Sequence, residues 1–205
     1  MSKLTRSALG AAMTAAVAFA TPAAVQAANV IDQSQTSNGA GFSSFNTAPS
    51  YAQSFQAGAN NVSGGGFFIR GSTGAAPSPF TIALWTNLPN QAGATQLASA
   101  TGTLSGPQMW FDLFWTPVAT VVDATYYLTI TRNFEPTTFS YNLSGTPDAY
   151  SRGIAYANPN YGATAALDFA FRTYTDDAFM AGAVPEPATW AMLILGFGAV
   201  GGALR

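Results

Sequence analysis

The sequence contains no cysteine and no histidine. Without these residues there can be no disulfide, no Ser-His-Asp or Cys-His catalytic triad, and no zinc site built from imidazole or thiolate ligands. The lack of cysteine does not identify a redox compartment, because an oxidising compartment permits disulfides without requiring them.

Charge is also scarce. Only 8% of the 205 residues are charged, whereas an ordinary soluble domain has about 25%. The single lysine is Lys3, and the formal net charge is −2. A chain with so few cations neutralises few phosphates, so we expect no nucleic-acid partner. The length suits one domain of roughly 100–200 residues together with targeting segments.

The N-terminus has the order of features found in a secretory signal peptide. Lys3 and Arg6 form a short basic region, and an uncharged, alanine-rich stretch follows from Ala8 to Ala20. Small residues then offer a site for signal peptidase, which we place between Ala27 and Ala28. The alternative is a retained anchor, but so short an alanine-rich stretch spans a bilayer poorly. The sequence therefore predicts export.

The C-terminus is an apolar run that follows two prolines. Pro185-Glu186-Pro187 precedes Trp190 and Ala191, and no further charge occurs before Arg205. About 17 residues at 1.5 Å each would reach roughly 25 Å as a helix, slightly less than a hydrocarbon core of about 30 Å. The prolines keep the flanking backbone extended and stop the helix from running upstream. We predict a marginal transmembrane helix with Arg205 on the cytoplasmic side.

This segment, residues 185–205, resembles the PEP-CTERM sorting domain in its PEP-x-x-W-A variant. The same domain is also catalogued as an ice-binding protein C-terminal domain, a label that by itself implies no ice binding. The resemblance implies that the Pro-Glu-Pro tripeptide is recognised and cut by an exosortase, a membrane cysteine transpeptidase, with Trp190 and Ala191 completing the signature. Bacteria that carry both this sorting domain and an exosortase usually make exopolysaccharide. The alternative is an ordinary tail anchor with chance prolines.

The resemblance has one departure, since family members usually end in several basic residues and Arg205 stands alone here. Either the basic cluster is truncated or stop-transfer is weak. The partners implied are signal peptidase, the exosortase, the membrane through the C-terminal helix before processing, and polysaccharide. We expect a precursor anchored in the inner membrane and then a product at the envelope surface or outside the cell.

Residues 28–184 form the body between the targeting segments 1–27 and 185–205. This body contains four arginines and eight acidic residues, which gives a net charge of −4. Apolar and polar residues alternate in four clear runs, at 80–85, 111–115, 126–131 and 167–174. Such alternation is typical of antiparallel strands buried on one side. With five weaker runs, we predict an all-β body, a single jelly-roll-like sandwich of roughly eight to ten antiparallel strands.

Between residues 50 and 175 the body resembles an extracellular bacterial β-sandwich module common in anchored surface proteins. The resemblance rests on four segments in the same order: Ala52–Phe55, Thr81–Trp85, Thr116–Leu128 and Asp168–Tyr174. It implies a fold and an extracellular location and brings no established activity. The polar tracts Ser34–Thr47 and Gly71–Pro79 predict loops.

Several aromatic side chains lie on the strand face opposite the larger apolar set. They are Phe68, Trp85, Phe114, Tyr127 and Tyr174, with Arg70, Asp112, Asp168 and Arg172 as polar neighbours. Such a platform can stack on sugar rings and bond their hydroxyls. The candidate glycan-binding residues are Trp85, Tyr127, Phe114, Tyr174 and Arg172. The alternatives are cross-strand pairs that only stabilise the sheet, and rings that lie under a loop.

The acidic residues are scattered, which favours a non-catalytic protein. Asp176-Asp177 is the only adjacent pair, and neighbours on a strand point to opposite faces, so they cannot act together across a glycosidic bond. We interpret the pair as a solvated strand end, with Ca²⁺ ligation in a loop as the alternative. Gly64-Gly65-Gly66 lacks the residues of a P-loop and predicts a bulge or a strand entry.

We therefore predict an exported, non-catalytic surface or matrix protein, sorted at its C-terminal motif, with no cofactor and no metal. One alternative is a glycan-cleaving enzyme that uses two carboxylates facing each other in a cleft, roughly 5–10 Å apart. The other is a purely structural, membrane-anchored surface protein without a ligand.

Overall fold

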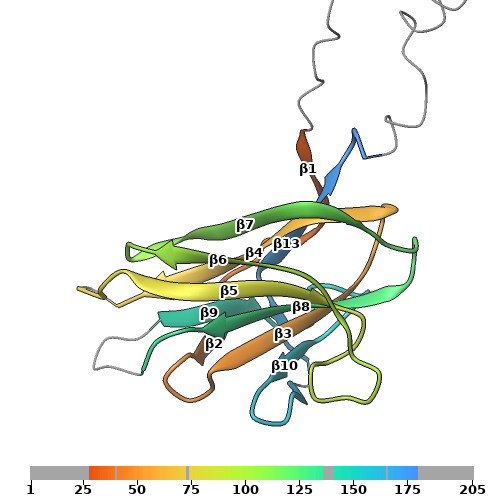
Figure 1. Cartoon of the computed structure of the whole chain (residues 1–205). Helices are drawn as coiled ribbons and strands as arrows, with labels where there is room; N and C mark the ends of the chain where they lie inside the picture. The colour runs from red at the N-terminus through yellow and green to blue at the C-terminus, as the bar shows by residue number, and fades with distance from the viewer. Residues whose placement is uncertain (1–27, 40, 73, 136–140, 165, 180–205) are drawn as a thin grey trace, which may run out of the picture.

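The computed structural model describes residues 28–39, 41–72, 74–135, 141–164 and 166–179. Every helix or strand assigned within these ranges is a β-strand (Figure 1). None of the described segments forms a helix long and apolar enough to cross a membrane. The predicted signal peptide and the predicted C-terminal helix lie outside the described residues.

The described residues form two sheets in which all pairs of strands are antiparallel. Sheet A contains β1 (Asn29–Gln35), β2 (Gly41–Ser44), β4 (Asn61–Gly71), β7 (Gln108–Ala119), β9 (Tyr141–Thr146), β12 (Asp168–Phe169) and β13 (Phe171–Asp176). Sheet B contains β3 (Ser50–Gln56), β5 (Ser78–Trp85), β6 (Gln96–Leu104), β8 (Thr125–Arg132), β10 (Ala155–Ala157) and β11 (Gly162–Thr164). The prediction of an all-β body made of antiparallel strands is confirmed.

Strands β2 to β9 wind back and forth between the two sheets. Their order is β2-β9-β4-β7 in sheet A and β3-β8-β5-β6 in sheet B, a winding of the jelly-roll kind. Strands β13 and β1 extend sheet A beside β4, and β10 and β11 extend sheet B beside β3. The result is a sandwich in which the long strands of the two sheets lie one above the other (Figure 1).

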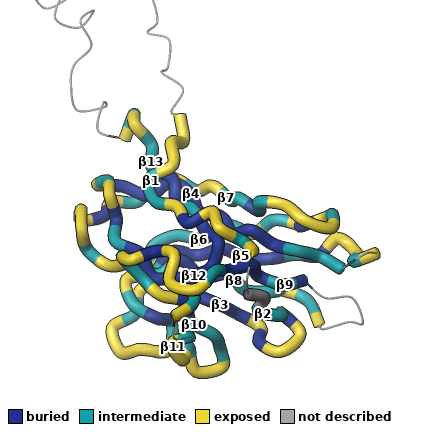
Figure 2. Tube along the Cα trace, turned by 180° about the vertical axis from the view of Figure 1, so that it is seen from behind, coloured by how far each residue is buried: buried dark blue, intermediate teal, exposed yellow. Residues whose placement is uncertain are grey.

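The core fills the space between the sheets (Figure 2). In the predicted run 80–85, alternation places Phe80, Ile82 and Leu84 on one side of the strand, and in β5 all three are completely buried. Phe80 packs edge-on against Phe45 at 4.9 Å and against Tyr141 at 5.5 Å between ring centroids. Burial of one such side chain contributes about 1.5–3 kcal/mol, so the alternating runs supply most of the force that holds the sheets together.

The described residues form thirteen strands, more than the roughly eight to ten predicted, and the structure corrects the prediction in two further places. Ser34–Thr47, predicted as a loop, contains the end of β1 and all of β2, two strands at the margin of sheet A. Their sequences are polar, so they carry little of the alternation on which the prediction depended. The predicted strand 167–174 is divided into β12 and β13 at Ala170, whose N–H donates to the Ser144 carbonyl while its own carbonyl accepts from Phe68 N–H. There the chain passes from pairing with β9 to pairing with β4.

The triple glycine lies inside β4, the strand of sheet A that pairs with β7 on one side and with β13 on the other. The register between β4 and β7 shifts between Val62 and Gly64, because β7 advances from Val118 to Phe114 over the same interval, so the extra residues lie on β7 and not on the glycines. From there Gly64, Gly65 and Gly66 continue as regular strand.

Candidate functional site

The structure divides the five candidate glycan-binding residues between two outer faces. Phe114 lies on β7 of sheet A, and Arg172 and Tyr174 lie on β13 of the same sheet. Strand β4 lies between β7 and β13. Trp85 and Tyr127 lie on β5 and β8 of sheet B. The prediction of one shared aromatic face is therefore wrong. Alternation shows which residues of a strand share a side, but it does not show which strands share a sheet.

The outer face of sheet A is called face A below. At its centre lie the glycines of β4, between β7 and β13. Phe114 and Tyr174 are both register partners of Gly64, and Asp112 and Arg172 are both partners of Gly66. A Cβ atom at Gly64 would lie 2.6 Å from Cδ1 of Phe114, and one at Gly66 would overlap the Asp112 carboxylate. The glycines therefore allow the side chains of β7 to lean over the central strand towards β13.

Asp112 forms a two-pronged ion pair with Arg172 across Gly66. Nε of Arg172 donates to Oδ1 of Asp112 at 2.7 Å, and Nη2 donates to Oδ2. The Tyr174 hydroxyl donates to the same Oδ1 at 3.0 Å. The side chains of Arg172 and Asp112 are only 21% and 17% exposed. A bidentate pair shielded in this way is stronger than an ordinary surface pair.

This environment perturbs two titratable groups. Burial, followed by the negative charge of Asp112, raises the pKa of the Tyr174 hydroxyl well above its usual value of 10.0. The hydrogen bond from Arg172 to Asp112 raises the pKa of the guanidinium. Both shifts favour the protonation states that hold the cluster together.

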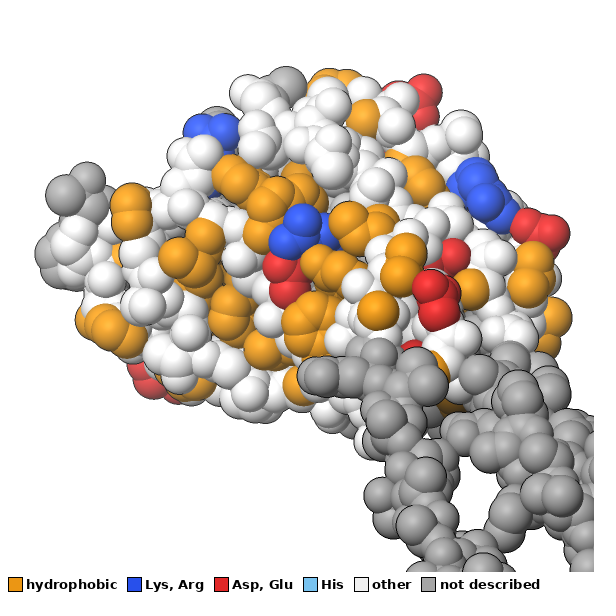
Figure 3. Space-filling model, turned by 90° about the horizontal axis from the view of Figure 1, so that it is seen from above, with side chains coloured by type: hydrophobic (Ala, Val, Ile, Leu, Met, Phe, Trp, Pro, Cys, Tyr) orange, Lys and Arg blue, Asp and Glu red, His pale blue; other side chains and the backbone are white. Residues whose placement is uncertain are grey.

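Rings surround the ion pair. The guanidinium carbon of Arg172 lies 4.3 Å from the ring centroid of Trp110, and Trp110 meets Phe68 edge-on at 5.6 Å. Phe114 meets Tyr174 at 4.9 Å, and Phe114 stays 48% exposed while Tyr174 is buried. Figure 3 views the molecule from this side, where a paired cation and anion stand among apolar side chains.

Trp110 was missed as a candidate, although the sequence contains the signal. It lies two residues before Asp112 and four before Phe114 on the same strand, so all three share one face. The alternation that selected Phe114 therefore selects Trp110 as well.

The outer face of sheet B, called face B below, places its two candidates side by side. Trp85 and Tyr127 are register partners on β5 and β8. Nε1 of Trp85 donates to Oγ1 of Thr129 at 3.1 Å, and the Tyr127 ring lies 5.9 Å from the Tyr156 ring. Burial raises the pKa of the Tyr127 hydroxyl. Both candidate rings are partly buried.

Elsewhere face B consists of small residues and hydroxyl groups. Thr101, Thr81, Thr131 and Ser50 form one register row across four strands. Their hydroxyls bond to one another, with 2.7 Å between Thr81 and Thr101 and 2.9 Å from Thr131 to Ser50. Ser50 is in turn 2.9 Å from the Tyr161 hydroxyl. These groups therefore satisfy much of their hydrogen bonding within the face.

The β5–β6 loop and the β10–β11 loop contact each other on sheet B. Nδ2 of Asn90, in the β5–β6 loop, donates to the Asn160 carbonyl in the β10–β11 loop at 2.8 Å. Strands β8 and β3 lie between the strands that carry these loops, so the bond bridges them. Ala52 and Ala83, which point outward from sheet B, are 0% and 4% exposed and lie outside the core cluster. The two candidate rings of this face contact residues on the strands of sheet B, which fits the alternative of cross-strand pairs.

Asp168 does not belong to either outer face, contrary to its predicted place beside the aromatic residues. It is 1% exposed, and its carboxylate accepts hydrogen bonds from Nε2 of Gln53 and from the Tyr150 N–H, each at 2.8 Å. Gln53 belongs to β3 and Asp168 to β12, so these bonds join sheet B to sheet A. Because the predicted strand is broken at Ala170, alternation with Arg172 does not apply to Asp168.

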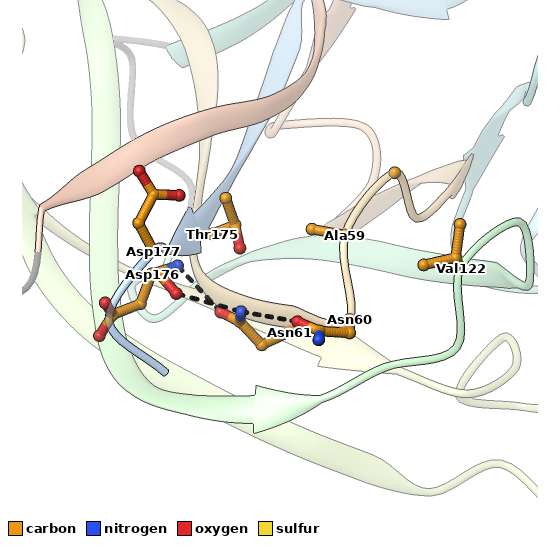
Figure 4. A pocket seen from close by; sticks show the side chains of 8 residues that line it. Ala59, Asn60, Asn61, Val122, Thr175, Asp176 and Asp177 are labelled. Carbon is orange, nitrogen blue, oxygen red and sulfur yellow. Dashed lines mark hydrogen bonds between the residues drawn. The ribbon is translucent and has the colours of Figure 1, made fainter. Parts of the chain in front are cut away.

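A shallow pocket of about 390 Å³ lies where β13 ends, lined by residues 58–61, Val122 and residues 175–177. Nδ2 of Asn61 donates to the Asp176 carbonyl at 3.2 Å, and the Asp176 N–H donates to Oδ1 of Asn61 at 2.9 Å (Figure 4). The carboxylates of Asp176 and Asp177 point in different directions there, as expected of a strand end. Within the described part of the chain, no three residues of the types His, Cys, Asp and Glu gather as a metal site would need.

The residues predicted for targeting lie beyond the sandwich. Pro185, Glu186, Pro187, Trp190, Ala191 and Arg205 fall outside the described residues, as does Ala27. Ala28 is the first described residue and immediately precedes β1.

Comparisons with known proteins bear on this C-terminal segment. A family model for the PEP-CTERM protein-sorting motif matches residues 183–205, a range that contains all six predicted sorting residues. No curated protein and no solved structure matches the chain. The chain therefore carries a PEP-CTERM sorting motif directly after its β-sandwich, the mark of a protein that is exported and processed by an exosortase from a membrane-anchored precursor.

Proposed function

We propose that the protein is a non-catalytic component of the cell-envelope surface or the extracellular matrix, and that it works there in association with exopolysaccharide. The observation that carries the proposal is the sorting motif at residues 183–205, placed after a single folded sandwich. The exosortase would act on the Pro185–Pro187 tripeptide, after signal peptidase has cut between Ala27 and Ala28.

The arrangement of the two chain ends supports processing at these sites. Asn29, at the start of β1, is the register partner of Asp176, at the end of β13. The start of β1 and the end of β13 therefore lie at the same end of the sandwich (Figure 1). The described strands run from Asn29 to Asp176, so cleavage at both predicted sites would leave all of the described strands in place.

The chemistry of the acidic residues supports a non-catalytic role. Asp112 is held by Arg172 and Tyr174, whose hydrogen bonds occupy three of its acceptor positions. Asp168 is buried between the sheets, away from solvent. A glycan-cleaving site needs an acid and a base on either side of a bound sugar, and these two residues suit neither role.

The proposal is tested by the intact mass and the C-terminal peptide of native protein recovered from its own envelope and medium. We expect a chain that begins near Ala28 and ends within Pro185–Pro187, and any excess mass would identify an attached group. A variant with all three motif residues changed to alanine is the control and should remain full length. Native protein that still extends to Arg205 would contradict the proposal.

A further inference from the structure

We propose that face A binds a neutral polysaccharide, with one sugar ring stacked on Phe114 and its hydroxyls bonded to the Arg172–Asp112 pair. This inference rests on the proposed function, which places the sandwich outside the cell beside exopolysaccharide. It goes further by naming one of the two faces and the class of ligand.

Phe114 is the stacking surface. Its ring packs above Gly64 and against Tyr174, and nearly half of the residue, 48%, remains exposed. The ring is therefore held in place by its neighbours before any ligand arrives, which reduces the entropy lost on binding. An exposed ring fixed in this way suits the apolar C–H face of a pyranose.

The ion pair beside the ring offers both a donor and an acceptor. Arg172 uses Nε and Nη2 for Asp112, and Nη1 makes no hydrogen bond to the described residues. Among the described residues, Nη2 is the only donor to Oδ2 of Asp112, so this oxygen has room for one more hydrogen bond. A donor and an acceptor side by side match two neighbouring hydroxyls of a sugar. Because the pair has no net charge, it does not select an anionic ligand.

The shape of face A favours a polymer over a small molecule. Small ligands are usually enclosed in a pocket, whereas Phe114 does not line either of the hollows described at the end of β13 and around Arg132. The row of Ile31, Tyr174, Gly64 and Phe114 crosses four adjacent strands on the open surface. A chain of sugars can lie along such a row.

Charge and area argue against other macromolecules. The body carries a net charge of −4, which disfavours polyanions. The exposed apolar side chains of the row are Phe114 and Ile31, each 48% exposed. Two side chains are a small fraction of the roughly 20–30 residues that each partner contributes to a stable protein interface.

The test is affinity electrophoresis of the mature exported protein in native gels. The gels contain dextran, a soluble β-glucan, alginate, or the exopolysaccharide extracted from the cells that make the protein. We expect retardation by the extracted polysaccharide or a neutral glucan, with a dissociation constant on the order of 1 mM for one site. Phe114→Ala should weaken retardation at least fivefold. Ile154→Ala, which changes a side chain that is 40% exposed elsewhere, is the matched control and should have no effect.

Thermal unfolding of each variant verifies that it is folded. Asp112→Asn is an independent test of the ion pair, since it should weaken retardation by removing a hydrogen-bond acceptor. Three outcomes would overturn the proposal: wild-type protein that none of the four polysaccharides retards, retardation that Trp85→Ala abolishes and Phe114→Ala does not, or retardation by alginate alone. Self-association in sedimentation that is lost in Phe114→Ala, without retardation, would assign the face to a second copy. The mass measurement tests sorting separately, so failure of this proposal leaves that result intact.

Discussion

The two outer faces of the sandwich are made from similar strands but differ in what covers the small outward residues of their strands. On face A the central strand contributes glycines at two outward positions, and large side chains from β7 and β13 meet above them. On face B the corresponding outward positions of β3 and β5 hold Ala52, Ala83 and Ser54, which are buried, and the segment at Gly153 and Ile154 packs on Ser54. On face A, side chains of the neighbouring strands fill the space above β4, and Phe114 remains exposed to solvent. On face B, a chain segment packs on the outward positions instead.

This difference shows that the glycines of β4 determine where the large side chains of the neighbouring strands can lie. Phe114 and Asp112 would stand apart from β13 if Gly64 and Gly66 had side chains, because the space above β4 would be filled. A ring that is exposed and fixed, beside a partly shielded ion pair, arises only where the neighbouring strand contributes no Cβ atom. The following predictions test this contrast between the faces, beginning with the largest effect.

Gly66→Ala should lower the free energy of unfolding by about 2 kcal/mol, because the new methyl group displaces the Asp112 carboxylate and breaks its bonds to Arg172 and Tyr174. Gly162→Ala, in the edge strand β11 of sheet B, meets nothing within 4 Å and is the matched control. It should change stability by no more than about 0.5 kcal/mol. Urea unfolding of the mature protein measures both. Equal effects would mean that face A does not depend on its glycines.

Asp112→Asn should cost about 1.5 kcal/mol, since Arg172 loses a charged partner in a partly shielded site. The comparison is Asp123→Asn, which breaks the ion pair with Arg152. There the side chains are 77% and 37% exposed, so the loss should stay below about 0.5 kcal/mol. The same unfolding assay at low and high salt separates them, because screening weakens the exposed pair more. A larger loss for Asp123 would reverse our ranking of the two sites.

On face B, Trp85→Phe should cost about 1 kcal/mol by removing the hydrogen bond from Nε1 to Thr129. A double-mutant cycle with Thr129→Val should give a coupling energy of about 0.5–1 kcal/mol. Neither change should alter retardation in polysaccharide gels. Additive effects of the two substitutions would show that the bond contributes nothing to stability.

The smallest effect concerns pH. The pKa of Tyr174 is raised in the folded protein, so its protonated form stabilises the fold fully below pH 10, and this contribution is lost as pH rises beyond that value towards the folded pKa. Tyr174→Phe should therefore lose less stability than the wild type between about pH 10 and 11.5. Tyr127→Phe is the counterpart on face B, where burial also raises the pKa. Unfolding curves at several pH values, with phenolate absorbance, provide the measurement, and identical pH slopes for wild type and Tyr174→Phe would count against the role of Asp112.

Particular elements show how far the sequence leads. Alternation in β5 identified Phe80, Ile82 and Leu84 as core residues, because burial of one side of a strand leaves a repeat of two in its sequence. The same rule failed for β2, which is short and polar, and for Asp168, where the strand is interrupted at Ala170. Local patterns are reliable only while the strand that they describe is continuous and has one buried side.

The sequence alone determined the sorting signal, since a targeting motif is read from a short, contiguous piece of chain by residue type and order. It also determined the all-β class and the inner side of the strands with clear alternation, such as β5 and β8. Only the tertiary structure decided that Trp85 and Phe114 lie on different faces, that Asp112 meets Arg172 across Gly66, and that Asp168 joins the sheets. These facts depend on which strands pair, and pairing is settled by contacts between residues that lie far apart in the chain.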